Sequence, residues 1–306
     1  MLGLKRRVNR KVKAMSNVLN HRIDFKVVFS VNGANPNGDP LNGNRPRQTS
    51  DGIGEVSDVA LKRKVRNRLQ DMGEKIFVQS DDRNDDGLTS LKARADAVAE
   101  LKKEKDVDKY AEVACKTWFD VRAFGQVFAF KGEKGDDSKG LSVGVRGPVT
   151  IQTARSITPI MINDMQITKS VTSDDSTNRS DTMGTKYSVD FAVYQFNGSI
   201  NVQLAEKTGF TEDDAKAIHE ALESLFENDE SSARPAGSME VLRVYWWEHE
   251  GKLGKTSPAK IFRSVEITPK DGTIELHSVD DVDWEKADSE ANEIDCANKG
   301  NVIFEG

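Results

Sequence analysis

Short segments of the chain are rich in β-branched and aromatic residues or alternate apolar with polar residues, which is typical of β-strands. The first of them, 23–31, ends in turn-forming residues, and we expect it to be a buried strand. We predict strands at 23–31, 118–130, 141–158, 187–195 and 241–247.

Two longer segments carry apolar residues at helical spacing instead. Residues 57–72 start with a serine or aspartate that can serve as the N-cap (Ser57 or Asp58) and stop before a glycine. Residues 211–226 start with Thr211 as the N-cap and place acidic residues in the first turn, where the helix dipole favours them. We predict one amphipathic helix in each segment.

The predicted order is strand, helix, strands, helix, strand, with large insertions. It is compatible with an α+β fold of ferredoxin-like (βαββαβ) topology, the topology of the RNA-recognition motif. The insertion at 74–115 contains a polar loop and then a predicted helix of mixed charge at 88–114. A second polar excursion, 169–186, lies between predicted strands and indicates an extended hairpin or arm.

Charge is distributed unevenly along the 306 residues. The formal net charge is −6, yet residues 1–70 contain 15 Lys and Arg against 5 Asp and Glu, so that their net charge is +10 and that of the remainder is −16. This asymmetry favours either a face that binds a polyanion or a basic tail on an ordinary acidic domain.

Other features of the composition narrow the class of protein. Cys115 and Cys296 are too few for a disulfide framework or a zinc site. No apolar run reaches the ~20 residues that span a bilayer, and the N-terminus lacks the apolar stretch of a secretory signal. We therefore expect a cytoplasmic protein with no membrane contact. Residues 1–21 are predicted to be a basic extension, dispensable or a nucleic-acid-binding arm, with the fold beginning near Arg22.

The first strand leads into residues 32–47, which are crowded with glycine, asparagine and proline and are called the Gly/Asn loop below. Such residues tolerate positive φ and let the backbone approach a ligand closely. The polar side chains of the loop are amides and guanidinium groups: Asn32, Asn35, Asn37, Asn42, Arg45 and Arg47. Both kinds of group donate hydrogen bonds to phosphate oxygens.

The predicted helix that follows is strongly basic. Five cations lie within two helical turns: Lys62, Arg63, Lys64, Arg66 and Arg68. A solvated cationic face is common on helices, but here no acidic residue lies between Asp58 and Asp71 to neutralise it. A strand, an amide-rich loop and a cationic helix in succession predict a site for a phosphate backbone.

The chain offers little for catalysis. The histidines are scattered: His21, His219, His249 and His277. None lies in a glycine-rich or basic motif, which disfavours general acid–base catalysis. The segment 251–256 lacks the first glycine of a phosphate-binding loop, and Pro258 breaks a helix after it. We expect no catalytic residue and no cofactor.

Metal binding and base stacking have few candidates. Aspartate pairs occur at 81–82, 85–86 and 174–175. They lie in predicted loops, so we expect no two-metal site, and Asp174–Asp175 is the pair to test. Among the aromatic residues Phe124, beside Arg122 and Gly125, is the best candidate for stacking on a base, and the others are expected in the core.

Four segments carry a distinctive combination of residues: NPNGDP at 35–40, SDVALKRKVRN at 57–67, FDVRAFG at 119–125 and GPVTIQTARS at 147–156. In combination they resemble the backbone subunits of CRISPR Cascade complexes, the Cas-seven family of repeat-associated mysterious proteins. The resemblance runs from about Arg22 to Ile267. It is closest to the type I-C branch, and the type I-B branch shares much of the pattern.

The resemblance implies a hand-shaped protein. An RNA-recognition palm at 22–267 would carry a helical finger insertion at about 74–116 and a thumb hairpin at about 157–186, followed by an acidic C-terminal segment at 268–306. Copies would stack along one CRISPR RNA (crRNA), each thumb over the neighbouring palm, with one base per repeat flipped out. The other bases would stay free to pair with target DNA.

The resemblance also implies partners and the absence of an activity. The other subunits of a Cascade complex in antiviral defence would be a 5′-handle-binding subunit, a large subunit and a small subunit. Backbone subunits of this kind lack nuclease activity, and a separate helicase–nuclease cuts the DNA.

The resemblance further implies which side chains contact the RNA. Phosphates would be held by the amides and arginines of the Gly/Asn loop and by Lys62, Arg63 and Arg66 on the helix. Candidates in the thumb are the cations Lys169, Arg179 and Lys186 and, as a wedge between bases, Met165 or Met183. Arg122, Phe124 and Arg155 would face the RNA from the sheet, and Arg234 lies in a short family-like segment at 231–234. A solvated surface charge is the alternative for each cation.

Three other functions stay open from the residues alone. An endoribonuclease of the same superfamily that processes crRNA would need a histidine, or a tyrosine–lysine pair, near the Gly/Asn loop. A backbone subunit that cleaves target RNA would use a thumb aspartate, Asp174 or Asp175. A polyanion-binding module outside CRISPR defence is the third.

Overall fold

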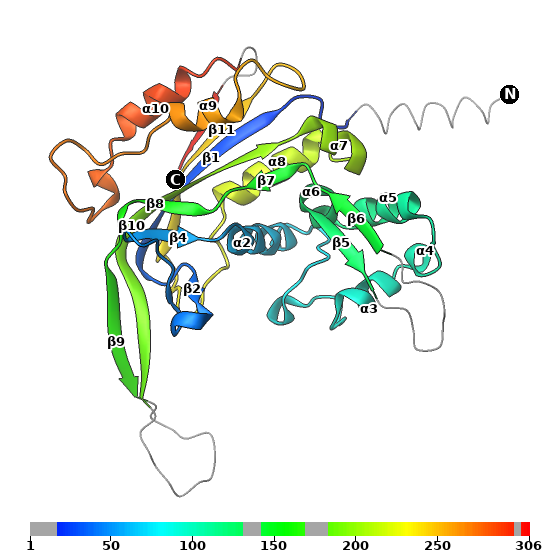
Figure 1. Ribbon diagram of the computed structural model, residues 1–306, viewed down its shortest axis with the longest axis horizontal. Helices are drawn as coiled ribbons and strands as arrows, with labels where there is room; N and C mark the ends of the chain where they lie inside the picture. The colour runs from blue at the N-terminus through cyan, green and yellow to red at the C-terminus, as the bar shows by residue number, and fades with distance from the viewer. Residues whose placement is uncertain (1–16, 131–141, 169–182, 297–300) are drawn as a thin grey trace, which may run out of the picture.

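The structure is a computed structural model that describes residues 17–130, 142–168, 183–296 and 301–306. Its largest element is an eight-stranded antiparallel sheet. The strands of this sheet are β1 (Ile23–Ala34), β4 (Ile53–Val56), β7 (Val149–Ile151), β8 (Ala154–Pro159), β9 (Ile162–Thr168), β10 (Met183–Ile200), β11 (Met239–Glu248) and β12 (Asn301–Glu305). Their order is β12-β11-β1-β10-β8-β4, and both β7 and β9 also pair with β10 (Figure 1).

Two smaller sheets and a set of helices complete the described fold. β2 (Gly38–Asp39) pairs with β3 (Arg45–Pro46), and β5 (Gly125–Ala129) pairs with β6 (Ser142–Arg146). The helices are α2 (Asp58–Asp71), α3 (Leu91–Asp96), α4 (Ala99–Lys102), α5 (Val107–Thr117), α6 (Phe119–Phe124), α7 (Val202–Thr208), α8 (Glu212–Glu223), α9 (Pro258–Ser264) and α10 (Trp284–Asn292). Three short 3₁₀ helices are η1 (Pro40–Asn42), η2 (Asp81–Arg83) and η3 (Val279–Asp281).

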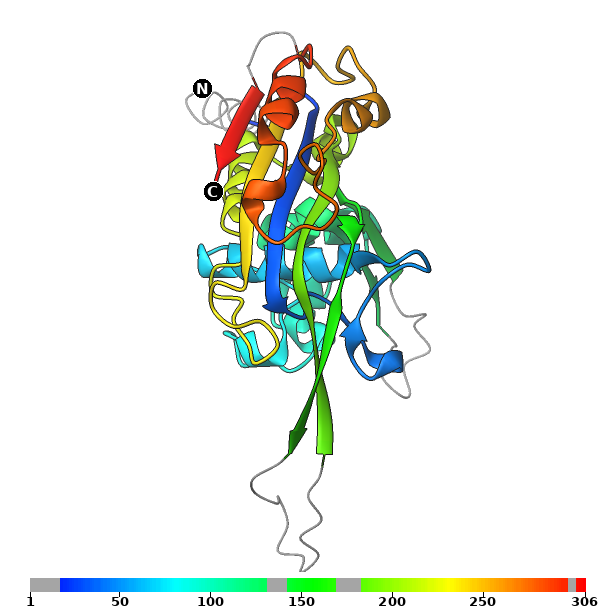
Figure 2. The ribbon, with the colours of Figure 1, turned by 90° about the vertical axis from the view of Figure 1, so that its left-hand side faces the viewer.

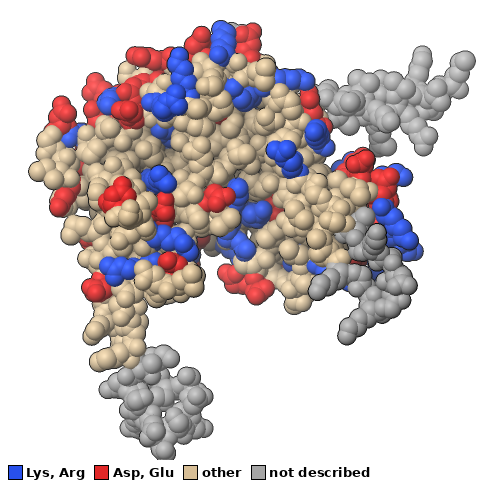
Figure 3. Space-filling model, in the orientation of Figure 1, with Lys and Arg blue, Asp and Glu red and all other residues tan. Residues whose placement is uncertain are grey.

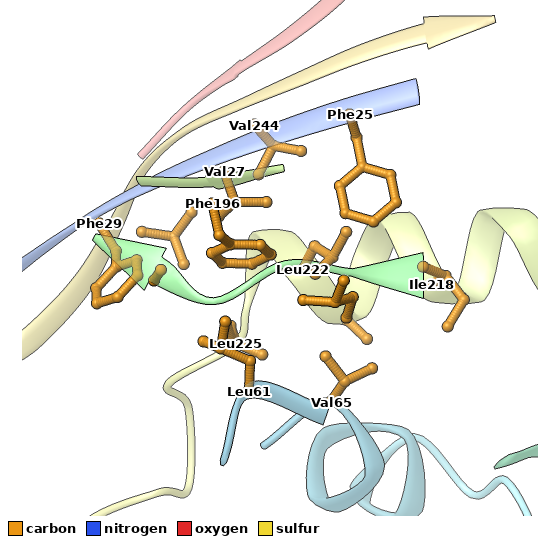
Figure 4. Close-up of a cluster of buried hydrophobic side chains, with 14 of the residues drawn as sticks. Phe25, Val27, Phe29, Leu61, Val65, Phe196, Ile218, Leu222, Leu225 and Val244 are labelled. Atoms are coloured by element: carbon orange, nitrogen blue, oxygen red, sulfur yellow. The ribbon is translucent and has the colours of Figure 1, made fainter. Parts of the chain in front are cut away.

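One face of the sheet packs on α2 and α8. Alternate residues of β1, among them Phe25, Val27 and Phe29, point to this face because successive side chains of a strand lie on opposite sides. They meet the apolar stripes of the two helices, which include Leu61 and Leu222 (Figure 4). All of these side chains are fully buried, so this layer is the main core of the molecule.

The opposite face of the sheet is covered by the C-terminal part of the chain. Val28 and Trp247 are fully buried there against residues of α9 and α10 such as Ile261 and Ala291 (Figure 2). β12 extends the sheet beyond β11. The acidic C-terminal segment therefore contributes both a layer and a strand to the fold.

A buried lysine joins this second layer to the sheet. Nζ of Lys26 on β1 donates to the backbone oxygens of Phe262 and Val265, at 3.3 and 2.5 Å, and to Oε1 of Gln195 at 3.0 Å. The two carbonyl groups lie at the C-terminal end of α9, where an ammonium group interacts favourably with the helix dipole. Burial nevertheless lowers the pKa of Lys26 to about 8, while Glu290 and Glu266 oppose the shift.

The β9–β10 hairpin extends beyond one end of the sheet, along the direction of its strands (Figures 1 and 2). The two strands pair from Thr168 and Met183 to Ile162 and Val189. The described helices of the insertion after α2 have a separate small core around Phe77, which packs with Trp118 and Phe128 at ring-centre distances of 4.6 and 5.1 Å.

The predicted mixture of helices and strands around a large sheet is confirmed. Both predicted amphipathic helices are present with the expected N-caps: Oγ of Ser57 accepts the N–H of Ala60, and Thr211 forms a capping box with Asp214. The predicted strands at 23–31, 187–195 and 241–247 lie within β1, β10 and β11.

Two predictions of secondary structure are wrong. Residues 119–124 form α6 and only 125–129 a strand, because Asp120 hydrogen-bonds the backbone of Phe77 and Val78 and the helix ends at Gly125 with φ +80°. The alternation of polar and apolar residues there had suggested a strand. The predicted helix at 88–114 is three short helices, α3 to α5.

Because burial lowers the pKa of Lys26, we expect the free energy of unfolding to depend on pH. Its pKa is about 8 in the folded chain and about 10.4 when unfolded, so between these values the unfolded chain binds more protons and stability rises with pH. We expect the wild type to gain about 1 kcal/mol per pH unit relative to Lys26→Met in this window, measured by urea unfolding from pH 8 to 10. A constant difference between the two proteins would contradict this assignment.

Candidate nucleic-acid interface

Hydrogen bonds within the Gly/Asn loop close it on itself. Nδ2 of Asn35 donates to the backbone oxygen of Asn44 at 2.7 Å, and the N–H of Arg47 donates to the oxygen of Asn37 at 3.1 Å. A side chain at Gly38 would collide with Asn44, whose Oδ1 lies 2.0 Å from the position of an added Cβ. The loop is therefore compact and requires glycine at this position.

The Gly/Asn loop is attached both to α2 and to the hairpin. Oδ1 of Asn37 accepts the N–H of Ser57, the N-cap of α2, at 3.0 Å. The guanidinium group of Arg45 lies over the ring of Tyr187 on β10, 5.1 Å from its centre. Three segments that the sequence singles out thus meet in one region. Figure 3 shows Lys and Arg side chains around α2 and the loop that carries β2, with acidic side chains between them.

The acids that neutralise much of α2 come from other parts of the chain. Lys62 pairs with Asp58 at 3.1 Å, as the sequence allows. The partners of Arg66 and Arg68 are distant in sequence: Asp120 at 2.9 Å and Glu227 at 2.7 Å. The helix has no acid of its own between Asp58 and Asp71, as the sequence shows, but acids from other segments pair with two of its arginines.

Lys64 is buried on α2 and pairs with Asp229, and its Nζ lies 5.5 Å from the ring centre of Phe226. Burial lowers the pKa of Lys64 to about 8, and Asp229 opposes the shift. Asp229 also accepts Nε of Arg234 at 3.0 Å. One carboxylate therefore holds two cations and fixes the segment of Arg234 against α2.

Arg63 and Arg66 differ from the other cations of α2. Among the described residues, Arg63 has no ion-pair partner within 4 Å. The pKa of Asp82 is lowered mainly by a hydrogen bond from the Ser80 side chain, and the charge of Arg63 contributes less. Arg66 uses only Nε in its contact with Asp120, and its guanidinium group lies 5.1 Å from the ring centre of Phe124. Phe124 is half-buried against the main core.

Three further arginine candidates in the described part of the chain, Arg122, Arg47 and Arg155, have acidic partners. Nε and Nη2 of Arg122 donate to both oxygens of Asp214, at 2.7–3.1 Å. Arg47 lies 3.4 Å from Asp39. Arg155 lies 3.3 Å from Glu55, but its side chain is 66% exposed, so this pair is open to water.

Other candidates lie in exposed positions or outside the described residues. Asn32 and Asn42 are exposed in the loop. On the hairpin, Met165 and Met183 are 64% and 70% exposed, and Lys186 lies opposite Met165. Lys169, Arg179, Asp174 and Asp175 lie outside the described residues.

Four residues that position these cations were not among the candidates predicted from the sequence: Asp120, Asp229, Asp214 and Tyr187. Asp120 is part of the FDVRAFG segment, so that motif offered one signal. Asp214 belongs to the capping box at Thr211, which predicts a helix start but not a contact with Arg122. Asp229 and Tyr187 lie in segments without a motif and become partners only through the fold.

The described histidines lie in contacts with acids. His21 is buried between Glu212 and Glu248, at 3.3 and 3.4 Å, and Nε2 of His249 lies 2.8 Å from Asp24. In the part of the chain that the structure describes, no three His, Cys, Asp or Glu residues are grouped to hold a metal ion. None of the described helices is long and apolar enough to cross a membrane.

Comparison with known proteins gives a family match over most of the chain. The model of the family described as "CRISPR-associated protein Cas7" matches residues 21–286. A curated relative, the "CRISPR-associated protein Cas7" of Haloferax volcanii, is 26% identical over 245 residues, which cover 76% of this chain and 72% of the relative.

The solved structures that match this chain include two chains of low sequence identity. A chain of a "CRISPR RNA-guided surveillance complex, pre-nicking" has a TM-score of 0.49 at 15% identity, covering 89% of this chain and 86% of that chain. A chain of the "Type III-B Cmr-beta bound to cognate target RNA" has a TM-score of 0.39 at 10% identity, covering 79% and 65%.

Because the Asp229 carboxylate pairs with both Lys64 and Arg234, we expect its removal to lower the stability of the fold strongly. Asp229→Ala leaves the buried ammonium group of Lys64 without its counter-charge, so we expect the free energy of unfolding to fall by about 3 kcal/mol. In the exposed pair Lys116–Glu112, Lys116→Ala should cost less than about 0.5 kcal/mol. Urea unfolding of both variants measures the difference, and equal losses would refute a special role for Asp229.

Proposed function

We propose that this chain, which belongs to the Cas7 family of CRISPR-associated proteins, is a non-catalytic backbone subunit of a CRISPR effector complex. Copies multimerise along a crRNA, hold its phosphates and leave base edges free to pair with target DNA. The motifs of the Gly/Asn loop and α2 favour the type I-C branch, with type I-B as the nearest alternative. The partners are the crRNA, further copies of the chain and the other subunits of a Cascade complex.

The observation that carries this proposal is the meeting of the Gly/Asn loop, the first turn of α2 and the base of the hairpin. A subunit that does not read sequence needs donors for phosphate oxygens and no base-specific pocket. Among the described residues, the donors that suit this task are Arg63, the unpaired edge of Arg66, Arg45, Lys186 and the exposed amides Asn32 and Asn42; the amide of Asn35 is buried and holds the loop closed instead.

An RNA-recognition palm is supported by the order of strands in the sheet. β1, β8, β10 and β11 alternate along the chain with α2 and α8 as strand, helix, strand, strand, helix, strand, and their order in the sheet is β11-β1-β10-β8. We assign the insertion at about 74–116 as fingers and the hairpin at about 157–186 as the thumb. The RNA would then run past the helix and loop, because α9 and α10 cover one sheet face and α2 and α8 the other.

The proposed absence of catalysis is supported by the setting of the histidines. His21 and His249 are buried in contacts with acids, and neither lies in the Gly/Asn loop or on α2. We expect crRNA incubated with the protein to stay intact. Shortened RNA products that disappear in Asp174→Asn or Asp175→Asn would support a ribonuclease instead.

The number of copies on one RNA tests the backbone role. Native mass spectrometry of the full chain with crRNAs of increasing length should give ladders of several copies on one intact RNA, and the ladder should lengthen with the RNA. One copy per RNA at every length would favour an RNA-binding module that does not assemble.

If Arg63 contacts a phosphate, its removal should change how RNA binding depends on salt concentration. Arg63→Ala should lower the slope of log K against log salt concentration by about 0.7, the value for one phosphate contact of a single strand. The control Lys116→Ala removes an exposed cation on α5 and should leave the slope unchanged. Affinity for labelled single-stranded RNA at several salt concentrations measures both, and an unchanged slope for Arg63→Ala would exclude it from the phosphate contacts.

A further inference from the structure

We infer that Asp120 is a positioning residue for RNA phosphate, because it holds one edge of the Arg66 guanidinium group and leaves the other edge free. The inference rests on the proposed function and adds to it a residue that acts through another. It also separates two arginines, Arg66 and Arg122, that the sequence treats as equivalent candidates.

The carboxylate of Asp120 is fixed by the backbone. Its Oδ1 accepts the N–H of Phe77 at 2.7 Å, and its Oδ2 accepts the N–H of Val78 at 3.1 Å and Nε of Arg66 at 2.9 Å. The side chain is 1% exposed. A buried carboxylate with three donors has little freedom to move, so it is a rigid reference point for the arginine.

The guanidinium group of Arg66 is held on two sides. Asp120 binds Nε, and the ring of Phe124 lies against the group at 5.1 Å. Within the described part of the chain, Nη1 and Nη2 have no hydrogen-bond partner. The four N–H groups of Nη1 and Nη2 therefore have no described partner, and their fork matches two oxygens of a phosphate, while 14% of the Arg66 side chain is exposed.

Arg63 lies one turn before Arg66 on the same helix. Side chains three residues apart on a helix are neighbours, with Cβ atoms about 5–6 Å apart. Arg63, which has no ion-pair partner among the described residues, therefore adds positive charge beside the unpaired edge of Arg66. Together they offer one oriented fork and one adaptable charge to the RNA backbone.

Arg122, unlike Arg66, is held by acidic side chains through two of its nitrogens. Its Nε and Nη2 already form the two-pronged contact with Asp214, Nη2 also lies 3.8 Å from Glu74, and its guanidinium group lies 4.6 Å from the ring centre of Phe119. The Nε–Nη2 edge is therefore occupied, and Nη2 is shared with a second acid, so a phosphate at Arg122 would compete with two carboxylates. Asp214 also accepts the N–H of Thr211, so this pair joins α6 to the start of α8 and is structural.

The two carboxylates provide a matched experiment. Asp120→Asn leaves one neutral acceptor oxygen for three N–H donors and turns an N–H₂ group toward one of them, so the charged anchor of Arg66 is lost and its orientation is weakened. We expect the full chain to bind labelled single-stranded RNA about tenfold more weakly, with a salt slope lowered by about 0.7, as in Arg66→Ala. The double variant should bind no more weakly than Arg66→Ala. Asp214→Asn removes a comparable buried partner and should keep the wild-type slope.

A second variant decides the case if Asp120→Asn does not fold. Arg66→Lys keeps the charge, but its single ammonium group cannot hold Asp120 and grip a phosphate with a separate edge. We expect it to bind as weakly as Arg66→Ala, and wild-type affinity would overturn the inference.

The possible outcomes separate the inference from the proposed function. Failure of the wild type to bind RNA would overturn both. A wild type that binds, together with an unchanged slope in Asp120→Asn or losses that add to those of Arg66→Ala, would overturn the positioning role alone.

Discussion

The central strand β1 pairs with a neighbour on both edges and is buried on both faces, and the rest of the architecture depends on this constraint. Its apolar face needs the stripes of α2 and α8. Its other face carries Asp24 and Lys26, and a buried charge is costly unless hydrogen-bonded partners surround it. Arg22 and His249 supply them for Asp24, and the end of α9 supplies them for Lys26. The C-terminal layer is therefore required by the residues of the first strand.

Because both faces of the sheet are covered, neither face is open for nucleic-acid bases to stack on. RNA-recognition motifs commonly stack bases on aromatic residues of an open sheet face. Here Trp247 and Tyr245 of β11 are buried beneath the C-terminal layer, and Trp246 lies in the main core on the other side. The surface that remains is the end of β1, where the Gly/Asn loop turns back to the N-terminus of α2. Such a surface suits phosphate contacts, because it offers donors and charges but few exposed aromatic rings.

Local signals predicted the elements that carry the site, while the partners of its charges could not be predicted. The N-cap residues and apolar stripes of α2 and α8 lie within single segments, and both helices could be placed from them. The pairs Arg66–Asp120 and Lys64–Asp229 join residues 54 and 165 positions apart, which no local pattern encodes. The FDVRAFG segment misled for a related reason: its alternation resembles a strand, but Asp120 faces inward to bind the backbone of another segment. A polar residue that is needed for a long-range contact, such as Asp120, can therefore produce an alternation of polar and apolar residues that resembles the two-residue period of a strand.

These pairings change how the basic composition of the chain should be interpreted. A phosphate that binds Lys64 or Arg122 must compete with a buried carboxylate, and breaking such a pair leaves a charge that is costly to bury. A phosphate at the open edge of Arg66 competes with no described carboxylate and finds the guanidinium group already oriented. Preorganisation of this kind favours binding because less side-chain freedom is lost when the contact forms. Under the proposed function, the α2 cations that can bind a phosphate are those that keep an unpaired edge among the described contacts, and they are fewer than the basic residues of the helix.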